Sequence, residues 1–411
     1  MKRILWIIPL LCLWIPIVNS EEQVQESENN QIETTEEGTD NTTQENNSPE
    51  NGLNLASNAK SAIMIEASTG KVIYEKNVEE QLPMASMTKM MTLLLIMENI
   101  ESGNLKWDEQ ITASEKAASM GGSQIFLSVG EQMSVEDMVK GICIGSGNDA
   151  AVAMAERIGG TEENFVKMMN DKVTELGLKN THFDNACGLD SDNHYSSAYD
   201  MAMIAKELVR HEKILEYTGT YEDYLRKNTD NSFWLVNTNK LVRYYQGVDG
   251  LKTGYTSTAG YCITTTAKRN NMRLITVVMG EPSSSIRNSE TTAMLDYGFN
   301  TYQIDTVLSK ETVLSKEKVT LGKQQYVEVI PQEDINILNT KTGTKRNVTY
   351  EVKLDSIKAP IKTGDSVGKI NIIENNQTIM TIDATVKTTI EKASLFTSYY
   401  RDLVDMMKGS L

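Results

Sequence analysis

Cysteine and histidine are scarce in this chain of 411 residues, which contains four cysteines and three histidines. Cys12 lies in an apolar leader, and the other cysteines, odd in number and without paired spacing, do not indicate a disulfide framework. The histidines lack the spacing of metal ligands as well. The sequence therefore predicts neither a disulfide-stapled fold nor a metal centre. The remaining residues of these two types are Cys143, Cys187, Cys262, His182, His194 and His211.

Long apolar runs are also few. One run, residues 4–18, follows a short positively charged start, and no other segment is apolar enough to span a membrane. Pro9 and Pro16 interrupt this run, which is shorter than the ~20 residues that a spanning helix needs. The pattern is typical of a secretory signal with cleavage after Ser20, and a membrane anchor is the weaker alternative. We therefore expect a secreted, extracytoplasmic protein.

Positive charge is in deficit. The formal net charge is −16, and loss of a leader that holds Lys2 and Arg3 makes it −18. Such a balance argues against nucleic acid as a partner. Residues 21–50 contain ten acidic residues and no Lys or Arg, and they bury too little apolar surface to offset the entropy of ordering. We expect a disordered acidic linker there.

The rest of the chain shows globular patterning. In residues 56–300, apolar and polar residues follow a strand-like pattern near both ends and a helical pattern between them. This predicts an α+β domain with one sheet flanked by helices. A Val-, Ile- and Thr-rich part with short alternating runs predicts a small β-sandwich-like domain. Apolar residues at helical spacing then predict an amphipathic tail helix. The predicted organisation is 1–20 signal peptide, 21–55 linker, 56–300 catalytic domain, 301–390 all-β domain and 391–411 tail helix.

Individual elements follow from the same patterns. The expected strands of the first domain are 61–66, 71–76, 261–267 and 274–279. The expected helices are 87–100, one that opens at Ser134, and 161–176. The expected strands of the second domain are 319–321, 326–330, 348–354, 369–373 and 379–386.

Three short motifs recur, and only one copy of each lies in a promising context. Among the copies, Ser-x-x-Lys begins at Ser57, Ser86 and Ser315, Ser-x-Asn begins at Ser27, Ser146 and Ser191, and Lys-Thr-Gly begins at Lys252, Lys341 and Lys362. At Ser86 a loop becomes a helix, so Lys89 lies one turn later on the same face. The positive end of the helix dipole and burial both favour a neutral amine, which could accept the Ser86 proton. The copies at 341 and 362 resemble turns.

The copies at Ser86, Ser146 and Lys252 follow one another in an order that resembles the motifs of the serine penicillin-recognising family, which includes penicillin-binding proteins and serine β-lactamases. The segments 83–89, 146–150, 187–190 and 249–256 are similar to those of low-molecular-mass D-alanyl-D-alanine carboxypeptidases, and the resemblance covers about 56–411. It implies a β-lactamase/transpeptidase-like domain with helices on a central antiparallel sheet. It also implies two partners, a peptidoglycan stem peptide as substrate and β-lactam antibiotics as inhibitors.

The resemblance assigns roles to individual residues. Ser86 would attack the carbonyl between two D-alanines with Lys89 as base, and Ser146 and Lys252 would relay a proton to the leaving D-alanine. The backbone N–H groups of Ser86 and Tyr255 would form the oxyanion hole, and no metal or organic cofactor is needed. The implied substrate-binding residues are Asn148, which orients the substrate amide, Thr253 and Arg287, which receive the free carboxylate, with Gly254 and Tyr255 beside them.

Two other functions remain open at this stage. A serine β-lactamase would share the motifs, but the region 180–185 lacks the Glu that deacylates in the best-known class. A wall-binding or penicillin-sensing module would be acylated without turnover. The segment 392–411 has little positive charge, so peripheral membrane contact through Phe396, Tyr399, Tyr400 and Leu403 competes with packing on the β domain.

Overall fold

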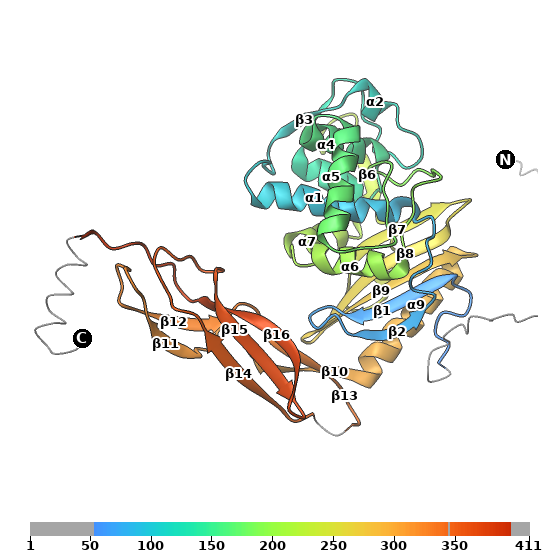
Figure 1. Cartoon of the computed structure of the whole chain (residues 1–411). Coiled ribbons are helices and arrows are strands. Elements are labelled where there is room, and N and C mark those ends of the chain that lie inside the picture. The colour runs from blue at the N-terminus through green and yellow to red at the C-terminus, as the bar shows by residue number, and fades with distance from the viewer. Residues whose placement is uncertain (1–52, 344–345, 396–411) are drawn as a thin grey trace, which may run out of the picture. The chain divides into compact units, whose positions relative to one another are not determined.

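A computed structural model describes residues 53–343 and 346–395 (Figure 1). The predicted signal peptide, most of the predicted linker and the tail after residue 395 lie outside the described residues. The four tail residues that precede Leu395 are not helical, so the predicted tail helix does not begin at residue 391. Among the described residues, none of the helices has both the length and the apolar character that crossing a membrane requires.

The first domain is built on one five-stranded antiparallel sheet with the strand order β2-β1-β9-β8-β7. The expected strands 61–66 and 71–76 pair with each other, and so do those expected at 261–267 and 274–279, which are longer than the pattern indicated because their ends are polar. The strands are β1 (Ser61–Glu66), β2 (Val72–Lys76), β7 (Val248–Thr256), β8 (Gly260–Arg269) and β9 (Met272–Glu281).

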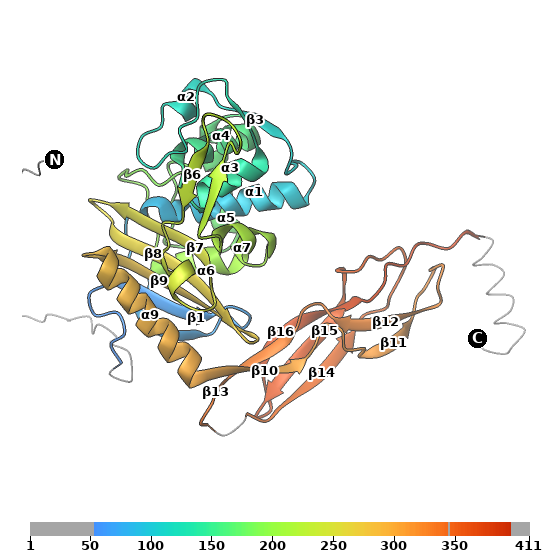
Figure 2. The same ribbon diagram turned by 180° about the vertical axis from the view of Figure 1, so that it is seen from behind.

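Both faces of this sheet are covered, which explains why the residues of β1 between Ser61 and Glu66 are apolar without interruption. Ile63 and Ile65 point to the face packed by α1 (Lys89–Glu101) and α6 (Ala198–Leu208). Ala62 and Met64 point to the opposite face, where α9 (Ser284–Thr301) lies across the sheet (Figure 2). Successive side chains of a strand alternate in this way, so one strand supplies two separate cores.

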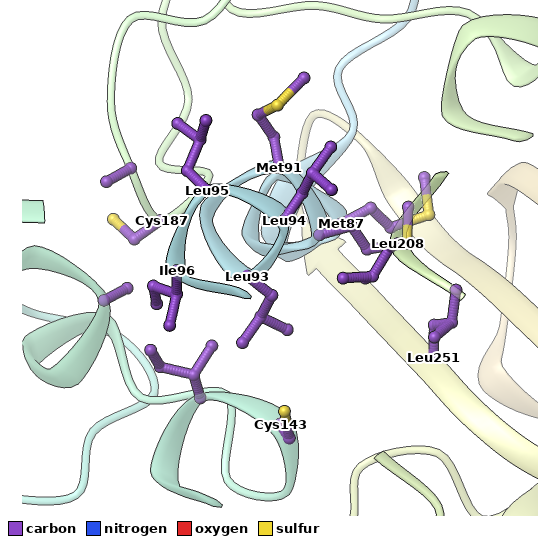
Figure 3. Close-up of a cluster of buried hydrophobic side chains, with 14 of the residues drawn as sticks. Met87, Met91, Leu93, Leu94, Leu95, Ile96, Cys143, Cys187, Leu208 and Leu251 are labelled. Atoms are coloured by element: carbon purple, nitrogen blue, oxygen red, sulfur yellow. The ribbon is translucent and has the colours of Figure 1, made fainter. Parts of the chain in front are cut away.

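α1 is apolar on all sides and is the centre of the larger core. Its residues from Lys89 to Met97 are buried, as expected for a helix without a polar face. Leu93, Leu94, Leu95 and Ile96 point in different directions around the helix axis, and Cys143, Cys187 and Leu251 lie around it (Figure 3). Ser86, which precedes this helix, is therefore held by an element that cannot shift without opening the core.

The remaining elements of this domain surround α1. Several helices begin at the cap that the sequence indicates: the Thr161 hydroxyl accepts a hydrogen bond from Asn164 N, and Ser134 accepts one from Asp137 N. These elements are α2 (Glu115–Ala118), α3 (Val135–Cys143), α4 (Asn148–Gly159), α5 (Glu162–Glu175), α7 (Lys213–Thr218), α8 (Leu241–Tyr244), and the hairpins β3 (Gln110–Thr112) with β4 (Gln132–Ser134) and β5 (Glu222–Leu225) with β6 (Phe233–Val236).

The second domain is all-β, as predicted. A two-stranded sheet, β10 with β13, and a five-stranded sheet of order β11-β12-β16-β15-β14 share one apolar core. The expected strand 319–321 is wrong, because this segment forms only one isolated bridge, Thr320 with Lys358. The strands are β10 (Tyr302–Leu308), β11 (Ser315–Lys318), β12 (Tyr326–Pro331), β13 (Ile335–Thr340), β14 (Val348–Leu354), β15 (Ser366–Glu374) and β16 (Gln377–Val386).

Candidate active site

Ser86 lies in a short 3-10 turn, η1 (Ala85–Thr88), that leads directly into α1. Ala85 has φ 48°, a left-handed conformation that is uncommon for alanine, so neighbouring groups must hold it. Two glycines allow this turn to be approached closely. A Cβ at Gly188 would lie 2.0 Å from Ala85 O, and a Cβ at Gly254 would lie 2.7 Å from Met84 O. Position 254 therefore requires glycine, because a side chain there would clash with the turn that holds Ser86.

Lys89 is fully buried and makes three hydrogen bonds through its amine. Nζ lies 2.9 Å from Ser86 Oγ, 2.7 Å from Asn148 Oδ1 and 2.6 Å from Cys187 O. Burial lowers the pKa of Lys89 to about 8, against the opposing effect of nearby negative charge. The Asn148 and Cys187 oxygens can only accept. A neutral Lys89 amine can therefore give its two hydrogens to them and direct its lone pair at the Ser86 hydroxyl.

Asn148 is the first residue of α4 and is held from several sides. Its Oδ1 accepts from Lys89, its Nδ2 donates to Gly121 O at 2.7 Å, and its backbone N–H donates to Ser123 O at 2.7 Å. The neighbouring Asp149 carboxylate accepts from the backbone N–H groups of Ile125 and Leu127, which fixes the same loop. Ser146, just before the helix, has φ 62°. The loop 121–127 and the Ser-x-Asn motif thus form one rigid wall.

Lys252 comes from β7 and is also fully buried. Burial, reinforced by the nearby Lys89 and Arg287 cations, lowers the pKa of Lys252 well below its ordinary value. Its amine donates to Thr253 O at 2.9 Å and, within the part of the chain that the structure describes, makes no hydrogen bond to Ser146. Two buried lysines with lowered pKa values therefore lie close enough for the charge of Lys89 to act on Lys252, which is unusual outside a catalytic site.

The outer end of the site is formed by residues around Thr253. Its hydroxyl lies 2.8 Å from the Thr238 hydroxyl, and Thr238 N donates to Ile144 O at 3.3 Å. Tyr255 is 57% exposed and packs on Tyr261 with 4.4 Å between ring centroids. β7 is the edge strand of the sheet, so one side of its backbone is open to an extended ligand.

Arg287 lies in the first turn of α9 and is buried beside the same strands. Its Nη1 lies 3.4 Å from the carbonyl oxygen of Cys262, and Cys262 is the register partner of Gly254. Among the described residues, no carboxylate forms a salt bridge with this guanidinium. A buried cation without a counter-ion is costly, so the position suits an anionic ligand group.

Glu281, a carboxyl group close enough to act on Arg287, faces a second carboxyl group, that of Glu290. Burial and the adjacent Glu290 raise the pKa of Glu281 to about 8, so Glu281 is neutral at pH 7. Glu290 Oε1 accepts from Ser57 Oγ, Asn58 N and Asn58 Nδ2, at 3.1, 2.9 and 2.7 Å, and pins that segment to α9. The remaining carboxylate oxygens of both residues are buried without another partner. We infer that one proton lies between them.

The other motif copies do not form such a site. Ser315 and Lys318 lie on β11, where residues three apart point to opposite faces. The copies at Lys341 and Lys362 lie in turns, as predicted. At the copy that begins at Ser57, the serine hydroxyl donates a hydrogen bond to the Glu290 carboxylate. The sequence analysis did not predict Thr238, which lies in the site against Thr253. It gave no role to His194, which lies behind the site against Thr88.

In the described ranges, no group of three or more His, Cys, Asp or Glu side chains could hold a metal ion. Cys143, Cys187 and Cys262 are buried free thiols, and burial is the largest cause of the raised pKa of each. Their part in the site is therefore packing and the Cys187 carbonyl oxygen.

Known proteins are similar to this chain over most of its length. The family described as D-alanyl-D-alanine carboxypeptidase matches residues 43–283, and the family described as penicillin-binding protein 5, C-terminal domain, matches residues 302–392. D-alanyl-D-alanine carboxypeptidase DacF of Bacillus subtilis is 50% identical over 355 residues, which are 86% of this chain and 91% of that protein. DacA of Escherichia coli is 34% identical over 331 residues, 78% and 81% of the two chains.

Solved structures agree with the sequence matches. Penicillin binding protein 5 from Haemophilus influenzae is 31% identical with a TM-score of 0.65, over 82% of this chain and 98% of that one. Penicillin-binding protein D2 from Listeria monocytogenes in its cefotaxime-bound form is 32% identical with a TM-score of 0.54, over 59% of this chain and 97% of that one.

Proposed function

This chain belongs to the D-alanyl-D-alanine carboxypeptidase family, and from that premise we propose that it removes the terminal D-alanine of peptidoglycan stem pentapeptides through an acyl-enzyme on Ser86. The observation that carries the proposal is the Lys89 amine, which has two acceptor-only partners and Ser86 Oγ as its third. This geometry supports a lysine that acts as a base near neutral pH.

Acylation would proceed by addition and elimination. Ser86 Oγ bonds to the penultimate D-alanine carbonyl carbon while its proton passes to Lys89 Nζ. The developing oxyanion accepts from the backbone N–H groups of Ser86 and Tyr255. The C–N bond then breaks, and the proton that Lys89 took from Ser86 passes through Ser146 and Lys252 to the leaving nitrogen, which becomes the amine of free D-alanine. Water attacks the acyl-serine in the second half-reaction and releases the shortened peptide.

Arg287 and Thr253 would receive the terminal carboxylate of the substrate. The guanidinium of Arg287 supports this role, because it hydrogen-bonds only to neutral groups among the described residues and a bound carboxylate would neutralise this buried cation. Asn148 would orient the substrate amide from the opposite side of the site. The open edge of β7, with Gly254 and Tyr255, would take the peptide backbone as an added strand.

We propose the same site for β-lactam antibiotics, because solved relatives include a cefotaxime-bound and an ampicillin-bound form. A cleaved signal peptide, residues 1–20, would place the enzyme outside the cytoplasmic membrane, where its substrate lies. The tail 392–411 would contact the membrane surface, and exposure of Leu395 at its start supports this. Deletion of 392–411 should then move the protein from the membrane fraction to the soluble fraction.

An intact-mass time course of residues 21–411 with benzylpenicillin tests the acyl-enzyme. Wild type should gain one lasting adduct, Ser86→Ala none, and the matched control Ser315→Ala the same adduct as wild type. Wild type should also release D-alanine from a pentapeptide, whereas Ser86→Ala should not. An adduct that vanishes within seconds while drug is consumed would point to a β-lactamase. A lasting adduct without D-alanine release would point to a non-catalytic module.

A further inference from the structure

A buried histidine lies behind the nucleophile without contact to the open site. His194 is 3% exposed, and its Nδ1 accepts a hydrogen bond from the backbone N–H of Asp184 at 3.0 Å. A backbone N–H can only donate, so Nδ1 carries no proton. Burial, which outweighs the nearby Asp184 carboxylate, lowers the pKa of His194 to about 4. The ring is therefore neutral at pH 7 and carries its one proton on Nε2.

The Nε2 proton has one acceptor. Nε2 lies 2.7 Å from the Thr88 hydroxyl, which must accept because the ring donates. The Thr88 hydroxyl then gives its own proton to Ala85 O at 2.8 Å. The chain begins at the Asp184 N–H, which can only donate, and ends at Ala85 O, which can only accept, so the direction of each hydrogen bond between them is fixed.

Ala85 O belongs to the peptide unit that also contains the N–H of Ser86. This unit is planar, and in its trans form C=O and N–H point in opposite directions. A group that fixes the carbonyl therefore also fixes where the N–H points. Ala85 has φ 48°, which alanine rarely adopts unless it is held. Among the described residues, the Ser86 N–H has no hydrogen-bond acceptor. An N–H that is to donate to a substrate oxygen must be free in this way.

We propose that His194 and Thr88 are positioning residues that aim the Ser86 N–H into the oxyanion hole. The inference rests on the proposed acyl-enzyme function and adds to it a cause for the orientation of one oxyanion donor. Neither residue touches the substrate. Each should therefore affect formation of the tetrahedral adduct and leave the initial binding of the ligand unchanged.

Two matched pairs of variants test this. Thr88→Val removes the hydroxyl at nearly constant shape, and Thr88→Ser keeps it. His194→Leu removes the donor, and His194→Gln offers an amide donor in its place. Stopped-flow acylation by benzylpenicillin separates the dissociation constant of the first complex from the acylation rate. Loss of a whole oxyanion donor costs ~10²–10³ in rate, so we expect misdirection to lower acylation roughly 10- to 100-fold.

The expected result is a lower acylation rate in Thr88→Val and His194→Leu, with an unchanged dissociation constant. Thr88→Ser and His194→Gln should stay within about threefold of wild type. A peptide boronic acid, whose adduct places an oxygen in the same hole, should lose affinity in parallel with the acylation rate. A merely structural role would not produce this parallel. If one variant fails to fold by circular dichroism, the pair at the other residue makes the same comparison.

Wild-type acylation rates in both Thr88→Val and His194→Leu would overturn the inference and leave the acyl-enzyme proposal intact. A rise in the dissociation constant at an unchanged acylation rate would also overturn it. Absence of any adduct on wild type would instead mean that the proposed function has failed.

Discussion

Glu281→Gln is expected to change how stability depends on pH. The folded chain holds a proton on Glu281 up to a pKa of about 8, whereas an unfolded chain releases it near pH 4.5. Folding therefore takes up a proton between these values, and the free energy of unfolding falls as pH rises, by about 1.4 kcal/mol per pH unit from this group. A glutamine amide donates to Glu290 at every pH. The variant should lack this slope.

The magnitude follows from the width of the window. Over three pH units the difference between Glu281→Gln and wild type should grow by up to about 4 kcal/mol in favour of the variant. Glu281 is buried, so solvent screens this effect little. Below pH 5 the two proteins should have similar stability, because glutamic acid and glutamine are then both neutral donors.

Urea unfolding at pH 5, 6, 7 and 8, followed by tryptophan fluorescence, measures the difference. The chain without residues 1–20 has two tryptophans, Trp107 and Trp234, so the signal reports on the first domain alone. Glu80→Gln, at an exposed carboxylate, is the matched control and should follow wild type at every pH. Parallel curves for Glu281→Gln and wild type would refute the shared proton.

Three further results are expected. Acylation by benzylpenicillin should rise with pH around a midpoint near 8 and level off above it, because only neutral Lys89 accepts a proton; a flat profile from pH 6 to 9 would contradict this. Gly188→Ala should lower the free energy of unfolding by at least about 1–3 kcal/mol and slow acylation, because the new Cβ would clash with Ala85 O and the φ of Gly188 is 91°. An unchanged melting temperature and acylation rate would refute this clash. Arg287→Gln should lower kcat/KM for a pentapeptide ~10²-fold, because the variant loses a charge-assisted contact with the substrate carboxylate. If the variant and wild type had the same KM and kcat, Arg287 would not be part of the site.

The sequence predicted those parts of the site that depend on local spacing. Ser86 and Lys89 are one helical turn apart, so a loop-to-helix boundary was enough to place them together. Spacing could not reveal that the third Lys89 acceptor is the carbonyl oxygen of Cys187, because this contact joins residues 98 apart in sequence. A backbone group also leaves no trace in a motif.

Residues that act through others were equally hidden. Thr238 and His194 contact Thr253 and Thr88 only after the sheet and helices have packed. In the second domain, the expected strand 319–321 failed because its alternation is too short to identify pairing partners. β10 and β13 pair with each other instead of with their neighbours in sequence, and were not predicted.

The strand order of the main sheet also has a consequence for biosynthesis. β1 pairs with β9, so residues 61–66 remain without this partner until residues 274–279 have been made. Contacts of such long sequence separation form late and slowly. The serine leaves the ribosome long before Lys252, Gly254 and β9, which complete its surroundings. A nascent chain thus carries Ser86 without the groups that surround it in the folded enzyme, and the site is complete only when nearly the whole of the first domain has been translated.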